Sequence, residues 1–198
     1  MDYQIMGFSF TTTQLIVTVV VLAVVILLAV GAYVQYRKTR TLALRSRFGS
    51  EYDRAIVRHG SALKAEAELA DRETRVEALK IRELGVNERD RFIAEWQIIQ
   101  SRFVDHPKAA VIEADDLVNE LLAVRGYPRA DFEQRAADLS VHHPRHVESY
   151  RFAHSIAVRH GHLEEATTEE LRTAMIKYRA MFEDLIQDRR AASSMSAA

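Results

Sequence analysis

Cysteine is absent from this chain of 198 residues, and so are the short motifs of nucleophilic and nucleotide chemistry. Without cysteine there is no disulfide, no thiolate zinc ligand and no cysteine nucleophile, and the composition suits a reducing compartment. The sequence contains no G-x-S-x-G, no Walker phosphate loop and no G-x-G-x-x-G. We therefore expect a protein that is not an enzyme, holds no cofactor and has no small-molecule substrate.

Signals for β-strands and for chain breaks are also scarce. The sequence has three prolines and seven glycines, no Asn-Gly or Asp-Gly pair, and no sustained alternation of polar and apolar residues. Strands and tight hairpins need such signals. The sequence therefore predicts an all-α protein, in which one N-terminal transmembrane helix is followed by a cytoplasmic helical domain of five to seven helices.

Charged residues are missing from positions 15–34, LIVTVVVLAVVILLAVGAYV. About twenty residues of helix cross the roughly 30 Å of hydrocarbon in a bilayer. The run is too long for the apolar part of a signal peptide, no Lys or Arg precedes it, and GAYVQYRK lacks a small-x-small cleavage site. We therefore predict a retained transmembrane helix at 15–36, after a short extracytoplasmic N-terminus at 1–14.

A cluster of five basic residues follows the apolar run: Arg37, Lys38, Arg40, Arg45 and Arg47. Basic residues close to a span stay on the cytoplasmic side, so we expect the N-terminus outside and the C-terminal domain in the cytoplasm. Each cation near an anionic leaflet contributes on the order of 1 kcal/mol of attraction, which predicts contacts with lipid headgroups. The alternative is a topology signal with no further role. Residues 37–50 would form a linker that ends at Gly49-Ser50.

The rest of the chain is acidic overall, because 22 basic residues face 27 acidic ones beyond position 47. Binding to a nucleic-acid backbone needs a clustered basic surface, so a nucleic-acid partner is not expected. The expected partners are the membrane and another protein or a second copy of this chain.

The helical domain is predicted at 51–190, and the tail 191–198, AASSMSAA, is predicted to be disordered. The first segment of the helical domain, 51–79, is highly charged, with a thin apolar stripe at Ala62, Leu69 and Val76. This segment is either a stalk or a loosely paired helix, divided in two if the chain breaks at Gly60.

Three stronger apolar stripes, with helical spacing, predict the core of the domain. The first contains Phe92, Trp96, Ile99 and Phe103; the second contains Ala110, Ala114, Leu117, Val118, Leu121 and Leu122; the third contains Leu171, Met175, Tyr178, Phe182 and Leu185. Helix starts are predicted at Asn87, at Pro107 and Pro144, and at the capping box from Thr167 to Glu170, with a short helix at 130–140.

Histidines gather in the C-terminal half, at positions 142, 143, 146, 154, 160 and 162. Neutral imidazoles bind transition metals and haem, and His143, His146 and His154 share one side of a predicted helix, which makes them the candidate metal ligands. No Glu-x-x-His and no H-E-x-x-H accompanies them. The alternative is a set of surface and half-buried histidines, with His154 hydrogen-bonded on an apolar face.

Two groups of charged residues stand at helical spacing. Glu113, Asp115 and Asp116 resemble an acid/base set, but they are expected to be solvated, and a solvated carboxylate has little reason to shift its pKa. Arg135 and Asp138, three positions apart, are expected to form a surface ion pair.

Several longer stretches resemble a known family: FVDHPKAAVIEADDLVNELLAVRGYP, DFEQRAADLSVHHP, VESYRFAHSIA and TTEELRTAMIKYRAMFEDL. They are similar to a widespread family of bacterial single-pass membrane-anchored helical proteins, and the likeness covers about Arg47 to Leu185. The resemblance implies a bacterial inner-membrane setting. It implies no activity.

Three functions are consistent with these patterns. The one favoured is a membrane-anchored adaptor or scaffold that presents a helical protein-interaction domain to the cytoplasm. The second is a membrane-tethered protein that binds metal or haem through its C-terminal histidines. The third is a self-assembling protein that organises the membrane through the charged segment 51–79.

Overall fold

The computed structural model describes residues 3–5, 8–10, 12–159 and 166–187. It divides into two compact units, residues 1–44 and 45–198, which are described separately. The tail predicted to be disordered, together with His160 and His162, lies outside the described residues.

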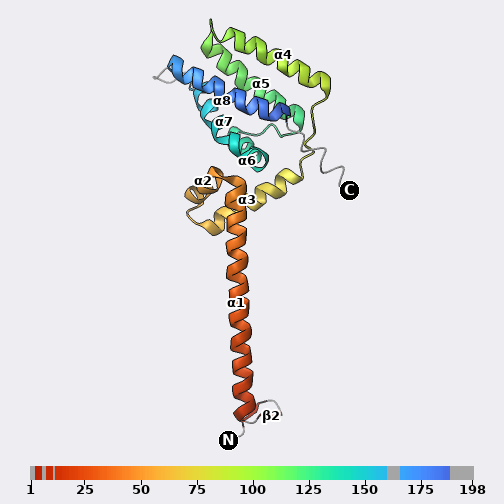
Figure 1. The fold of residues 1–198 in the computed structure, drawn as a ribbon, viewed down its shortest axis with the longest axis vertical. Coiled ribbons are helices and arrows are strands. Elements are labelled where there is room, and N and C mark those ends of the chain that lie inside the picture. Colours follow the sequence, from red (N-terminus) through yellow and green to blue (C-terminus); the bar gives the residue numbers. More distant parts are fainter. Residues whose placement is uncertain (1–2, 6–7, 11, 160–165, 188–198) are drawn as a thin grey trace. The chain divides into compact units, whose positions relative to one another are not determined.

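The first unit contains a short strand pair and most of one long helix. Strands β1 (Tyr3–Ile5) and β2 (Phe8–Phe10) pair in an antiparallel register, with Tyr3 opposite Phe10. Helix α1 (Thr12–Phe48) follows (Figure 1). The strand pair was not predicted, because strands of three residues are too short to show an alternating pattern.

Within the described residues, Gln14–Phe48 is the one helix that is long and apolar enough to cross a membrane, by length and composition. Its most apolar stretch buries no residue against the rest of the structure. Helix α1 also runs without a break through 37–48. The break expected at Gly49-Ser50 coincides with the end of α1 at Phe48 and the start of the next helix at Ser50. The stretch before it contains neither glycine nor proline to end a helix.

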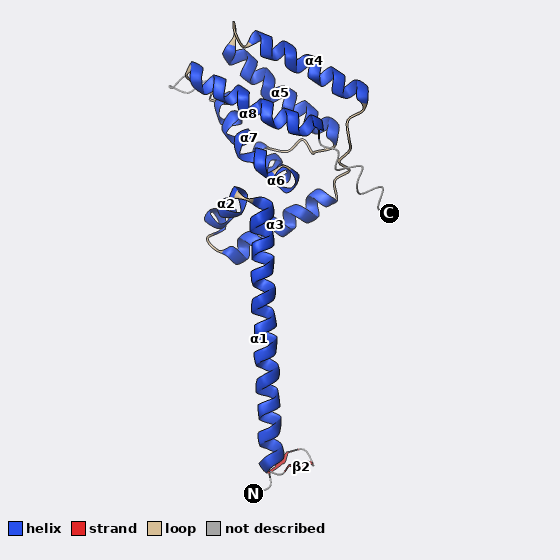
Figure 2. Cartoon of the chain, in the orientation of Figure 1, coloured by secondary structure: helices blue, strands red, loops and turns tan. Residues whose placement is uncertain are grey.

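Within its described residues, the second unit holds seven further helices, drawn in blue in Figure 2. They are α2 (Ser50–His59), α3 (Ala62–Glu77), α4 (Val86–Arg102), α5 (Pro107–Arg125), α6 (Phe132–His142), α7 (Pro144–Ala157) and α8 (Thr168–Gln187). The predicted fold class, an all-helical domain of five to seven helices after one long apolar helix, is confirmed.

Helix α8 lies at the centre of this domain, packed against α5 and α7, while α4 covers α5 from the outside (Figure 1). Helix α6 packs on α7. The hairpin of α2 and α3 is attached to the other side of this layer, through contacts of α3 with α6 and of α2 with α7.

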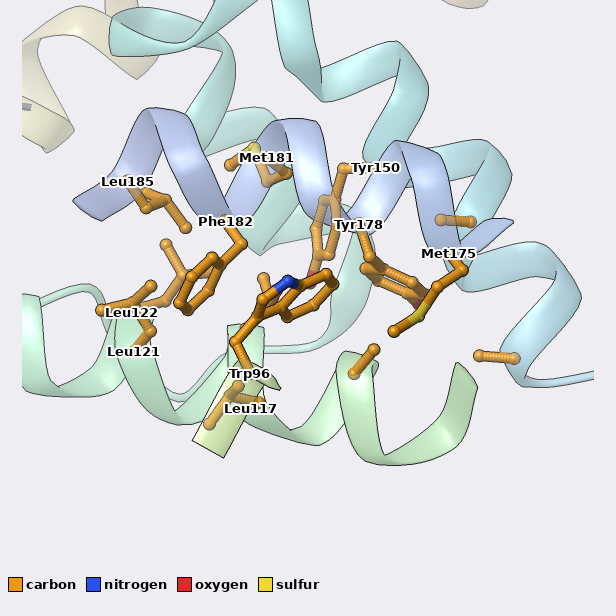
Figure 3. Packing of buried hydrophobic residues seen from close by; sticks show 14 of the residues in the cluster. Trp96, Leu117, Leu121, Leu122, Tyr150, Met175, Tyr178, Met181, Phe182 and Leu185 are labelled. Carbon is orange, nitrogen blue, oxygen red and sulfur yellow. The ribbon is translucent and has the colours of Figure 1, made fainter. Parts of the chain in front are cut away.

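The three predicted apolar stripes form the core where α4, α5 and α8 meet (Figure 3). Every residue of the stripes on α5 and α8 is buried, as are Phe92, Trp96 and Ile99 of α4, whereas Phe103 is only partly buried. The indole of Trp96 stacks on the ring of Phe182, with ring centroids 4.8 Å apart and planes 17° from parallel. Burying large aromatic rings in this way supplies much of the hydrophobic free energy of folding.

The charged segment 51–79 is a packed hairpin rather than a stalk. Gly60 adopts a positive φ of 69° and ends α2, so the chain turns back into α3. Phe48, Tyr52, Ala65 and Leu69 are buried between the two helices and their neighbours. Leu69 and Val76 of the predicted stripe are therefore covered within the chain, whereas Ala62 is exposed.

Two predicted helix starts had different outcomes. At α8 the capping box is confirmed: the Thr167 amide donates to Glu170 Oε2 at 2.8 Å, and the Glu170 amide donates to Thr167 Oγ1 at 3.2 Å. At α4 the predicted start at Asn87 is wrong. The cap there is Gly85, whose amide donates to the Glu88 carboxylate at 2.9 Å.

Candidate functional site

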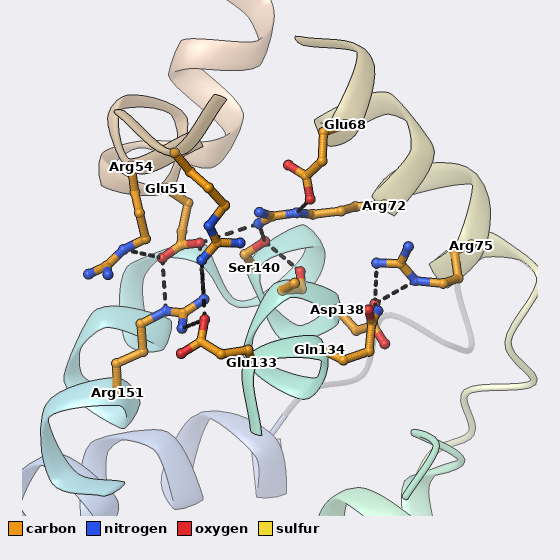
Figure 4. Close-up of polar contacts among 12 residues, drawn as sticks. Glu51, Arg54, Glu68, Arg72, Arg75, Glu133, Gln134, Asp138, Ser140 and Arg151 are labelled. Carbon is orange, nitrogen blue, oxygen red and sulfur yellow. Dashed lines mark hydrogen bonds and ion pairs between the residues drawn. The ribbon is translucent and has the colours of Figure 1, made fainter. Parts of the chain in front are cut away.

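A buried cluster of charges joins the α2–α3 hairpin to α6 and α7 (Figure 4). Its centre is Glu51, in the first turn of α2, which is completely buried. Glu51 Oε1 accepts a hydrogen bond from Arg151 Nε at 3.2 Å and forms an ion pair with Arg54 Nε at 3.2 Å, and Oε2 accepts a hydrogen bond from Arg72 Nη1 at 3.3 Å. We call Glu51, Arg54, Arg72 and Arg151 the Glu51 cluster.

Further acidic side chains compensate the arginines of the Glu51 cluster. Arg72 also contacts Glu68 at 2.5 Å and Ser140 Oγ at 3.1 Å, and Arg151 donates to Glu133 at 2.7 Å. A buried charge is tolerated only when it is paired and hydrogen-bonded in this way. The cluster therefore holds the hairpin in one defined position against α6 and α7, but it presents no reactive group to a cavity.

Asp138 belongs to the same interface, and its predicted surface pair with Arg135 is wrong. Its side chain is almost fully buried and accepts bonds from Arg75 Nε at 2.9 Å and from Gln134 Nε2 at 2.9 Å. Spacing along one helix shows only which residues share a face. It cannot show that another helix, here α3, supplies a nearer cation.

A second buried polar centre surrounds Asp115 in α5. Asp115 Oδ1 accepts bonds from Tyr178 at 2.8 Å and from His154 Nδ1 at 3.0 Å, and Oδ2 accepts one from Asn119 at 3.2 Å. The hydroxyl of Tyr150 donates to the other end of Asn119 at 2.9 Å. The expectation that Asp115 is solvated was wrong: it shares a helix face with buried apolar residues three and four positions away.

The surroundings of Asp115 decide which of these groups carries charge. Burial raises the pKa of Asp115, but the hydrogen bonds from His154 and Tyr178 outweigh it, so the pKa lies below its ordinary value. Burial, followed by the charge of Asp115, raises the pKa of Tyr178 far above its usual range. The tyrosine therefore remains a protonated donor, which suits a structural centre better than an acid/base site.

The three candidate metal ligands are not brought together. His143 and His146 line one cavity at the turn between α6 and α7, whereas His154 bonds to Asp115 and stacks on Phe132 at a centroid distance of 3.7 Å. Among the residues that the structure describes, no three His, Asp or Glu side chains are placed to hold a metal ion.

The predicted lipid-contacting residues fall into both units. Arg37, Lys38 and Arg40 belong to α1 in the first unit. In the second unit, Arg45 pairs with Asp53 at 3.5 Å and Arg47 pairs with Glu73 at 2.8 Å. These last two cations are thus engaged by acidic residues of the α2–α3 hairpin.

An open groove of about 290 Å³ runs between α4 and α5. It is lined by Glu95, Ile98, Ile99 and Arg102 of α4 and by Glu113, Asp116, Leu117 and Glu120 of α5. Both sets have the spacing i, i+3, i+4, i+7, so each is one face of its helix. We call this feature the α4–α5 groove.

Comparisons with family models, with curated proteins and with solved structures found no match. The geometry of this chain is therefore the basis for assigning it a function. Sequence inspection missed the α4–α5 groove because its acidic residues look like an ordinary solvated helix face. The signal that was available is Ile98, which lies outside the predicted core stripe and next to charged positions.

Proposed function

We propose that this chain is a membrane-anchored adaptor, which presents its helical domain to the cytoplasm and binds a partner protein in the α4–α5 groove. The observation that carries the proposal is the groove itself. It combines an apolar floor with an acidic border on a surface that no other described element covers.

The floor of the α4–α5 groove offers an apolar anchor point. Ile98 is 51% exposed, while Ile99 and Leu117 beside it are buried. An amphipathic helix docks in a groove of this kind with apolar residues at i, i+3, i+4 and i+7. The matching spacing on α4 and α5 favours a helical partner that lies along them.

The border of the groove indicates the charge of that partner. It carries four carboxylates, of which Glu113 pairs with Arg102 at 3.1 Å and Glu120 pairs with Arg91 at 2.9 Å. Asp116 forms no ion pair within the described residues, and burial followed by the charges of Asp115 and Glu113 raises its pKa. This excess negative potential favours a basic amphipathic helix.

The anchor in this proposal is the apolar part of α1. The basic residues that follow it favour an orientation with the N-terminus outside and the domain in the cytoplasm. The bacterial inner membrane is the location that belongs to this proposal. Lipid headgroups are then the partners of Arg37, Lys38 and Arg40.

Replacing Ile98 with glutamate is expected to reduce capture of the partner about tenfold or more, because it puts a charge on the apolar floor and adds to the acidic border. The measurement is in-cell crosslinking of the full-length protein, followed by affinity purification and quantitative mass spectrometry. Ile176 in α8 is 53% exposed and lies outside the groove. Ile176→Glu is therefore the matched control, and it should retain the partner.

Three outcomes of this experiment are decisive. Loss with Ile98→Glu and retention with Ile176→Glu supports the groove as the docking site, above all if the lost protein contains a basic amphipathic helix. Equal recovery with both variants, or recovery of nothing but the chain itself, contradicts the proposal.

A further inference from the structure

A cavity of about 650 Å³ opens beside the turn between α6 and α7, and neither the proposed function nor the polar centres described above use it. Its lining comes from three separate segments of the second unit: Ser46 and Arg47 at the end of α1, residues 141–146, and Asp184 of α8. The volume lies within the range of about 300–1,000 Å³ that is usual for small-molecule sites.

Nitrogen donors dominate the charged and polar lining of this cavity. Two guanidinium groups, Arg47 and Arg145, and three imidazoles, His142, His143 and His146, face a single carboxylate, Asp184. That carboxylate contacts Nδ1 of His143 at 2.5 Å. The lining thus has an excess of groups that donate hydrogen bonds or carry positive charge.

Two of these groups are available to a ligand. Arg145 and His146, in the first turn of α7, take part in no side-chain hydrogen bond or ion pair within the described residues. Arg47 is oriented by Glu73 at 2.8 Å, and His142 Nδ1 lies 3.2 Å from the hydroxyl of Tyr127. The neighbours of Arg145 and His146 are therefore held in place, as a preformed site requires.

We propose that this cavity binds a phosphate monoester, with the phosphate held by Arg145 and His146. A guanidinium matches a phosphate with two parallel, charge-assisted hydrogen bonds, and imidazole N–H groups supply further donors. Arg47, from the end of α1, adds a further guanidinium to the lining. A bare phosphate ion would fill little of the volume, so the ligand carries an organic group on its remaining oxygen.

A metal ion is a poorer occupant of the same cavity. Two guanidinium groups repel a cation, and the single carboxylate is already engaged with His143. The excess of donors thus selects an anion.

The phosphate monoester has two possible sources. One is the headgroup of a monoester lipid such as phosphatidic acid. A soluble metabolite would offer the same phosphate. The chemistry at Arg145 and His146 is common to both.

The test uses full-length protein with isotope-labelled histidine. In maltoside micelles the protein is titrated with glycerol 3-phosphate, a soluble monoester. In nanodiscs its binding to phosphatidic acid, a monoester lipid, is compared with its binding to phosphatidylglycerol, an anionic phosphodiester. Nuclear magnetic resonance of the His146 ring locates binding, and calorimetry measures the affinity.

Arg145→Gln is expected to weaken binding about tenfold or more. Arg129 is exposed, outside the cavity and without an ion pair in the described chain, so Arg129→Gln should bind like wild type.

Either source supports the proposal: glycerol 3-phosphate binding in micelles indicates a soluble ligand, and binding of phosphatidic acid alone indicates a lipid. The proposal is overturned if neither probe shifts the His146 resonance, or if Arg145→Gln binds as tightly as Arg129→Gln. Equal binding of phosphatidylglycerol and phosphatidic acid also overturns it, because the site would then sense charge and not a monoester. The experiment on the α4–α5 groove tests a different site, so its outcome does not change the interpretation of these binding results.

Discussion

Replacing Glu51 with alanine is expected to lower the free energy of unfolding by about 3–5 kcal/mol, because it leaves buried arginines without their shared carboxylate. Arg72 and Arg151 are 1% and 8% exposed, so water cannot replace the lost partner. Glu51→Gln keeps the shape and part of the hydrogen bonding, and its effect should be smaller. Most domains have only about 5–15 kcal/mol of stability, so this loss is large.

Urea unfolding of the full-length protein in micelles measures this effect. The fluorescence of Trp96 is a suitable probe, because it is the only tryptophan and stacks on Phe182 inside the domain. Glu169 pairs with Arg172 on the surface of α8, and Glu169→Ala serves as the control, because an exposed ion pair of this kind contributes little to stability. A change for Glu51→Ala as small as that of the control would show that the Glu51 cluster does not hold the hairpin in place.

Replacing Asp115 with alanine is expected to destabilise the domain by about 2–4 kcal/mol at pH 7, because Tyr178, His154 and Asn119 lose their shared acceptor. The loss should depend on pH. The folded-state pKa of Asp115 lies below its ordinary value of 3.8, so its ionised form stabilises the folded state. That contribution is fully present above the ordinary pKa and disappears as the pH falls through the lower folded-state value.

Unfolding of wild type and Asp115→Ala in urea, at pH values from 7 down to 3, measures this dependence. The difference in free energy of unfolding between the two proteins should be constant down to about pH 5 and should shrink below about pH 4. Asp116→Ala is the matched control at the next position. Burial, Asp115 and Glu113 raise the pKa of Asp116, so its charge disfavours folding at neutral pH and its removal should leave stability unchanged or slightly higher. A pH-independent difference for Asp115→Ala would contradict the assignment.

The core was predictable from the sequence because burial along a helix repeats locally. Tyr178 and Phe182 of α8 and Trp96 of α4 each stand in a run with helical spacing, and each is buried where expected. The capping box at Thr167 is equally local, since both partners lie within one turn. Patterns of this kind need no knowledge of the neighbouring helices.

The polar centres were not predictable in the same way. The partners of Glu51 include Arg72 and Arg151, 21 and 100 positions away, and no local pattern announces such pairs. The segment containing Glu51 therefore looked like a solvated helix. Asp115 did carry a local signal, because Val111 and Val118, four positions before and three after it, lie on the same helix face and are buried.

The candidate sites depended on tertiary structure to different degrees. His143 and His146 were singled out from their spacing, but the cavity that they line also needs Arg47 and Asp184 from distant segments. His154 was grouped with them because it shares their helix, and the structure places it with Asp115 instead. The α4–α5 groove needs two helices at once, so neither helix alone revealed it.

The most direct test of the central claim, a membrane anchor with the helical domain in the cytoplasm, is cysteine accessibility in intact cells. The chain has no cysteine, so Ser9→Cys near the N-terminus and Ser101→Cys in α4 each give a single reporter. A membrane-impermeant maleimide is predicted to label the Ser9→Cys protein in intact cells, and the Ser101→Cys protein only after the membrane is permeabilised. Labelling of Ser101→Cys in intact cells, or its release in a soluble fraction without α1, would contradict the account.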